Sequence, residues 1–175
     1  DGQILEEVYV YGSFVQSKMY MSDVTCADCH DVHSMKVVKE DNELCLKCHR
    51  ADLYDTYDHH FHKKKDQEGD PILAKSGEVL FAVGEGAECV KCHMPGQHYM
   101  GIDYRPDHSL RIPRPDLSVS LGTPNACTAC HAEQGAAWAA AQIRPRYPPP
   151  AAGYQDIADT FAAAEHGRPG APAAV

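Results

Sequence analysis

Regular hydrophobic periodicity is confined to a few short parts of this chain. Near its start, four apolar residues recur at helical spacing: Ile4, Val8, Tyr11 and Val15. The spacing predicts a helix within residues 1–22, although Gly12 and several β-branched residues keep a strand possible. Residues 67–88 hold two short apolar runs on either side of Lys75-Ser76-Gly77, and this arrangement predicts a short β-hairpin.

Two further helices are predicted in the last third of the chain. The Ala-rich run that follows an N-cap at Thr123 or Asn125 predicts a helix as far as Arg144-Pro145. The stretch RYPPPAAGY then reads as a stiff linker, and QDIADTFAAAEHG predicts one more helix that ends at Gly167. We therefore expect a mostly irregular fold with a few α-helices.

The composition does not suit a core made of side chains alone. Phe, Trp and Tyr together make up 8% of the chain, and 12 prolines and 13 glycines interrupt it often. The net charge of −9 disfavours nucleic acid as a partner, because phosphate binding needs clustered Lys and Arg. No apolar run reaches the roughly 18 residues of a membrane-spanning helix, so we expect no transmembrane segment.

All eight cysteines occur in four copies of one pentapeptide, C-x-x-C-H. The copies begin at residues 26, 45, 89 and 127, and their cysteines are Cys26, Cys29, Cys45, Cys48, Cys89, Cys92, Cys127 and Cys130. A single C-x-x-C could be half of a zinc site, a redox dithiol or a disulfide. None of these requires a histidine directly after the second cysteine in every copy.

C-x-x-C-H is the attachment signature of c-type haem. Each thiol can form a thioether with one vinyl group of the porphyrin, and the adjoining imidazole binds the iron from the proximal side. The pattern predicts four covalently bound haem c groups with the proximal ligands His30, His49, His93 and His131. Four apolar porphyrins would then form most of the core, and we expect the haem-free chain to be largely unfolded.

The remaining histidines supply candidates for the opposite face of each iron. They are His33, His59, His60, His62, His98, His108 and His166. Methionine is the competing ligand, but we favour histidine on both faces of all four haems. His33 lies too close to His30 to bind the same iron, so we expect it to bind a neighbouring one.

The segment YDHHFH places three histidines within four residues. His60 and His62 share a face if it is extended, whereas His59 and His62 do so if it is helical. We predict His33, His60, His62 and His108 as distal ligands, with His59 or His98 able to replace one of them. Five cations are candidate partners of the haem propionates or plain surface residues: Lys47, Lys91, Arg105, Arg111 and Arg114.

Several of these motifs in combination resemble the multihaem c-type cytochromes of the cytochrome c554 and doubled-CxxCH groups. They are DGQILEEVYVYGSF, DHHFH, CVKCHMP, YRPDHSLRIPRPDLS and GTPNACTACH. The resemblance covers residues 1–145, which we expect to form a tetrahaem cytochrome c domain, and it departs from the family at 67–88. It implies bis-histidine haems in closely stacked pairs, an exported protein and electron transfer. It supports His33, the His60/His62 cluster and His108 as distal ligands.

The predicted function is electron transfer through a low-potential relay of four haems in a periplasmic or extracellular protein. We expect redox partner proteins and either a larger complex or a homopolymer, such as an extracellular filament. Residues 146–175 are expected to form a linker, a short helix and a tail that docks on a partner or neighbouring subunit. The alternative is a haem enzyme that reduces a small nitrogen or sulfur compound at one open iron, for which no C-x-x-C-K site is present.

Overall fold

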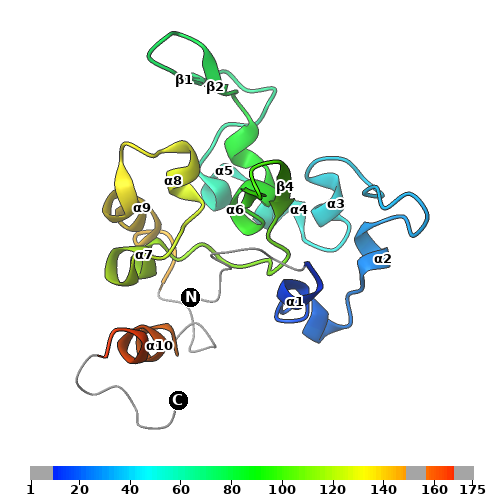
Figure 1. Cartoon of the computed structure of the whole chain (residues 1–175). Coiled ribbons are helices and arrows are strands. Elements are labelled where there is room, and N and C mark those ends of the chain that lie inside the picture. The colour runs from blue at the N-terminus through cyan, green and yellow to red at the C-terminus, as the bar shows by residue number, and fades with distance from the viewer. Residues whose placement is uncertain (1–9, 149–156, 168–175) are drawn as a thin grey trace. The chain divides into compact units, whose positions relative to one another are not determined.

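A computed structural model describes residues 10–148 and 157–167 of the chain (Figure 1). The described residues divide into two units, one formed by 10–112 and the other by 113–148 together with 157–167. Each unit is described here by itself. The single haem domain expected over 1–145 stays a prediction.

The unit of residues 10–112 is mostly irregular, and its helices are single turns. They are α1 (Val10–Phe14), η1 (Tyr20–Ser22), α2 (Cys26–Cys29), α3 (Glu43–Leu46), α4 (Ala51–Tyr54), α5 (Tyr57–His60), η2 (Glu85–Ala87) and α6 (Cys89–His93). Local chemistry sets their limits. Thr25 and Asp28 form a capping box at the start of α2, and α5 ends because Phe61 takes a left-handed conformation with φ of 65°.

Two antiparallel hairpins belong to the same unit. Strands β1 (Ile72–Leu73) and β2 (Val79–Phe81) pair across a turn that contains Gly77 at φ 86°, which confirms the hairpin predicted within 67–88. This hairpin extends away from the helices of its unit (Figure 1). Strands β3 (Gly96–Tyr99) and β4 (Asp103–Pro106) form a second hairpin that the sequence patterns did not predict.

The second unit contains α7 (Pro115–Leu121), α8 (Cys127–Cys130), α9 (Gly135–Ile143) and α10 (Ala158–Glu165). Helix α7 packs against α9, with Leu117, Ala139 and Ala140 buried. The single helix predicted up to Arg144 is interrupted between α8 and α9. The chain leaves the helix at His131 and re-enters it at Gly135, whose φ of 77° is a conformation that favours glycine.

Helix α10 confirms the predicted final helix, and Gly167 follows it in a left-handed conformation with φ of 60°. Residues 149–156 and 168–175 lie outside the described residues. The linker and the docked tail expected there therefore stay predictions.

Few large side chains are buried in the described part of the chain. Five of the buried hydrophobic residues there are alanines: Ala87, Ala126, Ala139, Ala140 and Ala158. Val32 and Met35, on the segment that follows His30, are instead 65% and 66% exposed. A chain that leaves large apolar side chains uncovered and buries small ones suits a core supplied by another apolar body, as the sequence predicted.

An ion pair at the start of α7 provides a test of the second unit. The Arg114 guanidinium lies 2.7 Å from the Asp116 carboxylate and holds its pKa below the usual value. Because the folded-state pKa is depressed, the pair stabilises the fold above the ordinary carboxyl pKa, and this contribution is lost as the pH falls through the folded pKa. We expect Asp116→Asn to destabilise the haem-loaded protein by about 0.5 kcal/mol at pH 7.

Thermal unfolding of both proteins at pH 7 and at pH 3 measures this effect. The difference between them should shrink at the lower pH. An equal difference at both pH values would show that Asp116 acts through packing and not through its charge.

Candidate functional site

The four pentapeptides adopt one local structure, a helical turn with the histidine at its end. Helices α2, α6 and α8 begin at the first cysteine of their pentapeptides. In the second copy, the turn of α3 continues because the N–H groups of Cys48 and His49 donate to the Cys45 carbonyl at 3.2 and 3.0 Å. A helical turn places positions i and i+3 on one side, so both thiols of a pentapeptide face the same way.

Two of the histidines predicted as proximal ligands are oriented by backbone carbonyl groups. Nδ1 of His30 lies 2.9 Å from the Met35 oxygen, and Nδ1 of His93 lies 2.8 Å from the Arg111 oxygen. A carbonyl oxygen can only accept a hydrogen bond, so Nδ1 carries the proton in each ring. Nε2 then keeps its lone pair, which is the state needed to bind a metal.

His108 faces the first of these rings. Its Nδ1 donates to the Pro106 carbonyl at 2.9 Å, so its Nε2 also keeps a lone pair. The ring centroids of His30 and His108 are 6.2 Å apart, with an interplanar angle of 30°. The structure thus brings a predicted proximal ligand and a predicted distal ligand together.

His59 faces the second ring. The centroids of His59 and His93 are 6.1 Å apart, and their planes differ by 12°. His59 stands on α5, the helical turn that places it next to the third pentapeptide. The sequence prediction favoured His60 and named His59 as a possible replacement.

The spacing of both pairs fits an iron atom between the rings. Two metal–nitrogen bonds of about 2.0 Å and a distance of about 1.1 Å from each nitrogen to its ring centroid place axial imidazole centroids about 6 Å apart. The separations of 6.2 and 6.1 Å agree with this value. Together with the thiols beside His30 and His93, these residues fit a c-type haem at each position.

His60 is the last residue of α5, and His62 lies beyond the turn at Phe61. Nδ1 of His62 donates to the His60 carbonyl, so Nε2 of His62 carries no proton and keeps its lone pair. Nδ1 of His60 instead accepts a bond of 3.3 Å from the His62 N–H, and its Nε2 is buried without a hydrogen-bond partner in the described part of the chain. The ring of His62 occupies the space that a Cβ at Gly86 would fill.

Burial keeps several of these imidazoles neutral. It lowers the pKa of His59 and His60, and it lowers the pKa of His93, against the opposing effect of the bond to the Arg111 carbonyl. Metal binding requires the neutral imidazole, so the surroundings favour the form that can act as a ligand.

The other two histidines predicted as proximal ligands have aromatic neighbours. His49 lies edge-on to Tyr54, with ring centroids 5.6 Å apart, and Tyr54 also lies edge-on to His59 at 5.2 Å. In the second unit, the ring of His131 lies 4.9 Å from that of Trp138. No sequence pattern singled out Tyr54. Its contacts with both rings depend on the turn between α4 and α5.

Two remaining histidine candidates are exposed. His33 is exposed in the turn after His30, and its N–H donates to the Asp31 carboxylate at 3.2 Å. His98 is exposed on β3, where its ring lies 5.1 Å from that of Tyr104.

The first three attachment segments are linked to one another through side chains. Lys47, predicted as a possible propionate partner, donates to the Asp28 carbonyl at 2.7 Å and so joins the second segment to the first. Between the second and third segments, the free Cys89 thiol of the haem-free chain donates a hydrogen bond to Cys45, which lowers the pKa of Cys45 and raises that of Cys89. The attachment points of these two segments therefore lie side by side.

Asn42 is a further residue of this region that the sequence patterns missed. It occupies the N-cap position of α3, and its side chain reaches across to the segment that begins α6. An Asn shortly before a helix is a recognised local capping signal, but nothing in the sequence indicates a contact with a residue 47 positions later.

Comparison with known proteins agrees with the haem assignment. Residues 34–109 match the family model described as cytochrome c554 and c-prime, and this segment contains two of the four pentapeptides. No curated protein matches the chain. A solved structure, that of the outer cell wall cytochrome OcwA, is similar with a TM-score of 0.42 and 21% identity. The similarity covers 82% of this chain and 29% of that one.

No helix in the described part of the chain is long and apolar enough to cross a membrane. The pentapeptides and the matched segment lead to the same class of protein, in which covalently bound haem c transfers electrons. The chain is similar to the multihaem c-type cytochromes, and residues 34–109 carry its likeness to the cytochrome c554 family.

Proposed function

We propose that the chain binds four haem c groups, one at each pentapeptide, and passes electrons along them as a low-potential relay. When bound, each haem supplies an iron that changes between the ferric and ferrous states. Support for the number four comes from the shared helical turn that presents paired thiols and a histidine at each of the four sites. Histidine on both faces of an iron leaves no position for a substrate.

The observation that carries this proposal is the spacing of two imidazole pairs. His30 with His108, and His93 with His59, stand at the separation that one iron between them requires. His33, His60 and His62 remain candidates for the irons bound by His49 and His131. Of His60 and His62, the hydrogen bonds favour His62 as a ligand, since Nδ1 of His62 donates whereas Nδ1 of His60 accepts.

The protein's own residues prepare these sites for electron transfer in two ways. Carbonyl groups of Met35, Pro106 and Arg111 fix the orientation of three rings, so little reorganisation accompanies a change of iron charge. Burial of His59 and His93 holds them neutral and limits the access of water to the metal.

The linked attachment segments favour a relay that runs in sequence order through the first three haems. Lys47 joins the first and second segments, and the thiol contact of Cys45 with Cys89 joins the second and third. We further propose an exported protein, periplasmic or extracellular, that exchanges electrons with redox partner proteins or with further copies of itself. The resemblance to exported multihaem cytochromes supports this location.

Three measurements on the purified, haem-loaded protein test the proposal. Mass spectrometry should find four haem adducts, the absorption spectrum should be that of low-spin c-type haem, and carbon monoxide should leave the reduced spectrum unchanged. A high-spin ferric signal or ready binding of carbon monoxide would favour a haem enzyme with one open iron. Fewer than four adducts would contradict the four-haem relay.

A further inference from the structure

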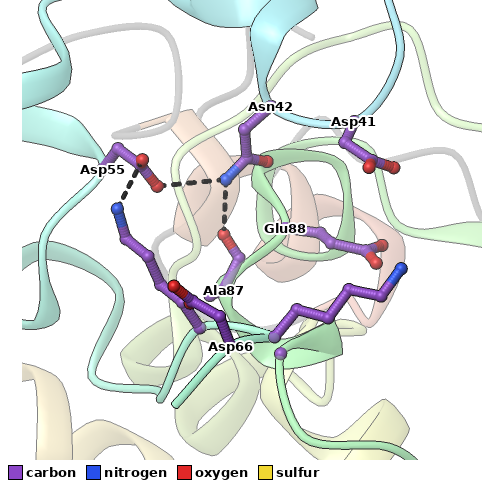
Figure 2. Close-up of a pocket in the computed structure, with 9 residues that line it drawn as sticks. Asp41, Asn42, Asp55, Asp66, Ala87 and Glu88 are labelled. Atoms are coloured by element: carbon purple, nitrogen blue, oxygen red, sulfur yellow. Dashed lines mark hydrogen bonds and ion pairs between the residues drawn. The ribbon is translucent and has the colours of Figure 1, made fainter.

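Asn42 joins the second attachment segment to the third through two hydrogen bonds of its side chain. Its side-chain Nδ2 donates to the Ala87 carbonyl at 2.9 Å, and its Oδ1 accepts from the Cys89 N–H at 2.8 Å. Figure 2 shows the amide of Asn42 between Asp55 and the Ala87 carbonyl, beside a cavity of about 360 Å³. The nitrogen and the oxygen of this amide therefore both bind a segment more than 40 positions away along the chain.

The position of Asn42 makes this contact a link between two helices. Asn42 is the N-cap residue of α3, which carries Cys45, and Cys89 is the first residue of α6. The first N–H groups of a helix have no acceptor within that helix. Asn42 supplies the acceptor for Cys89 and so holds the beginning of α6 against the beginning of α3.

A second set of contacts fixes the orientation of the Asn42 amide. Nδ2 also donates to Asp55 at 3.2 Å, and the other oxygen of Asp55 accepts from Lys64 at 2.6 Å. The Asp55 side chain is 18% exposed, so this network is largely sheltered from water. A carboxylate and a carbonyl can only accept, so the amide nitrogen must face them and the amide oxygen must face Cys89. Hydrogen bonds shielded from water in this way are stronger than exposed ones.

The link brings together two sulfur atoms that each carry a cofactor. Asn42 joins the start of α3 to the start of α6, so Cys45 and Cys89 lie close together, and each sulfur is the first thioether position of its pentapeptide. A thioether holds one edge of a porphyrin within bonding distance of its cysteine. The separation of these two sulfurs therefore limits the separation of two haem edges.

We propose that Asn42 is a positioning residue that sets the distance between the haems attached at Cys45 and at Cys89. The inference rests on the proposed function, since it requires haem at both positions. Electron tunnelling weakens steeply as the gap between donor and acceptor widens, so Asn42 also sets the rate of exchange between these two haems. It acts through the backbone of α3 and α6 and touches neither iron.

The test compares Asn42→Ala with Asn125→Ala in the haem-loaded full chain. Asn125 is a matched control, because it also precedes a pentapeptide, but its Oδ1 accepts from Thr128 within its own segment, at 3.1 Å. Electron paramagnetic resonance of the fully ferric protein reports the magnetic interaction between neighbouring haems. We expect Asn42→Ala to keep four haem adducts and a low-spin spectrum but to lose the interaction of one haem pair. Asn125→Ala should retain every interaction of the unsubstituted protein.

A second variant provides the test if Asn42→Ala does not acquire its haems. Asn42→Asp has the same shape and keeps an acceptor for Cys89, but it loses the donor to Ala87 and brings a carboxylate against Asp55. We expect it to weaken the same magnetic interaction. An unchanged interaction in a variant that carries four haems would overturn the role of Asn42 and leave the relay intact. Fewer than four haems in the unsubstituted protein would instead overturn the relay.

Discussion

The haem-free chain should show no cooperative thermal unfolding. In the described residues, most buried hydrophobic side chains are alanines, and these bury too little apolar surface to offset the conformational entropy of a chain of this length. The many prolines and the single-turn helices add little stability of their own. We expect Ser at all eight cysteine positions to give a protein with weak far-ultraviolet circular dichroism and a broad, featureless melt.

Loss of a single attachment site provides the control for this experiment. Cys127→Ser with Cys130→Ser removes only the fourth site, which lies in the second unit. The other three haems should still attach, and a cooperative transition should remain. A sharp transition in the protein without any cysteine would contradict the view that the cofactors form the core.

Substitution of His59 by methionine should raise the potential of one haem on the order of a few tenths of a volt, because axial ligands move haem potentials over a range of about 0.8 V. A thioether favours ferrous iron more than an imidazole does. His59 is the residue to change because its ring stands opposite His93. A spectroscopic redox titration of the purified protein resolves a single haem that titrates well above the others.

His98→Met is the matched control, since His98 is exposed on β3 beside Tyr104. It should leave all potentials where they are. If His59→Met changes nothing and His60→Met moves one haem, the choice made from the sequence is right and the assignment of His59 is wrong.

The chemistry of the site could be predicted from the sequence because it depends on a short repeated motif. Every pentapeptide forms its turn from residues within five positions, and the hairpin within 67–88 is equally local. The choice between His59 and His60 was not accessible in the same way. It depends on a four-residue helix that ends at Phe61 in a left-handed conformation, and so short a helix leaves no periodicity to detect.

Contacts between distant segments could not be predicted from the sequence for a different reason. The break between α8 and α9 depends on the backbone conformation of Gly135, within a run that is otherwise rich in alanine. The pairing of His30 with His108, and the reach of Asn42 to Cys89, depend on how loops close in space. A single sequence carries no signal for such pairings.

The distance along the chain between His30 and His108 has a consequence for biogenesis. If the two share an iron as proposed, 78 positions separate them, from 30 to 108, and the pair His59–His93 lies wholly inside that loop. A chain that emerges from its N-terminus would therefore present the first attachment site 78 residues before the histidine that completes it, whereas only 34 positions separate His59 from His93.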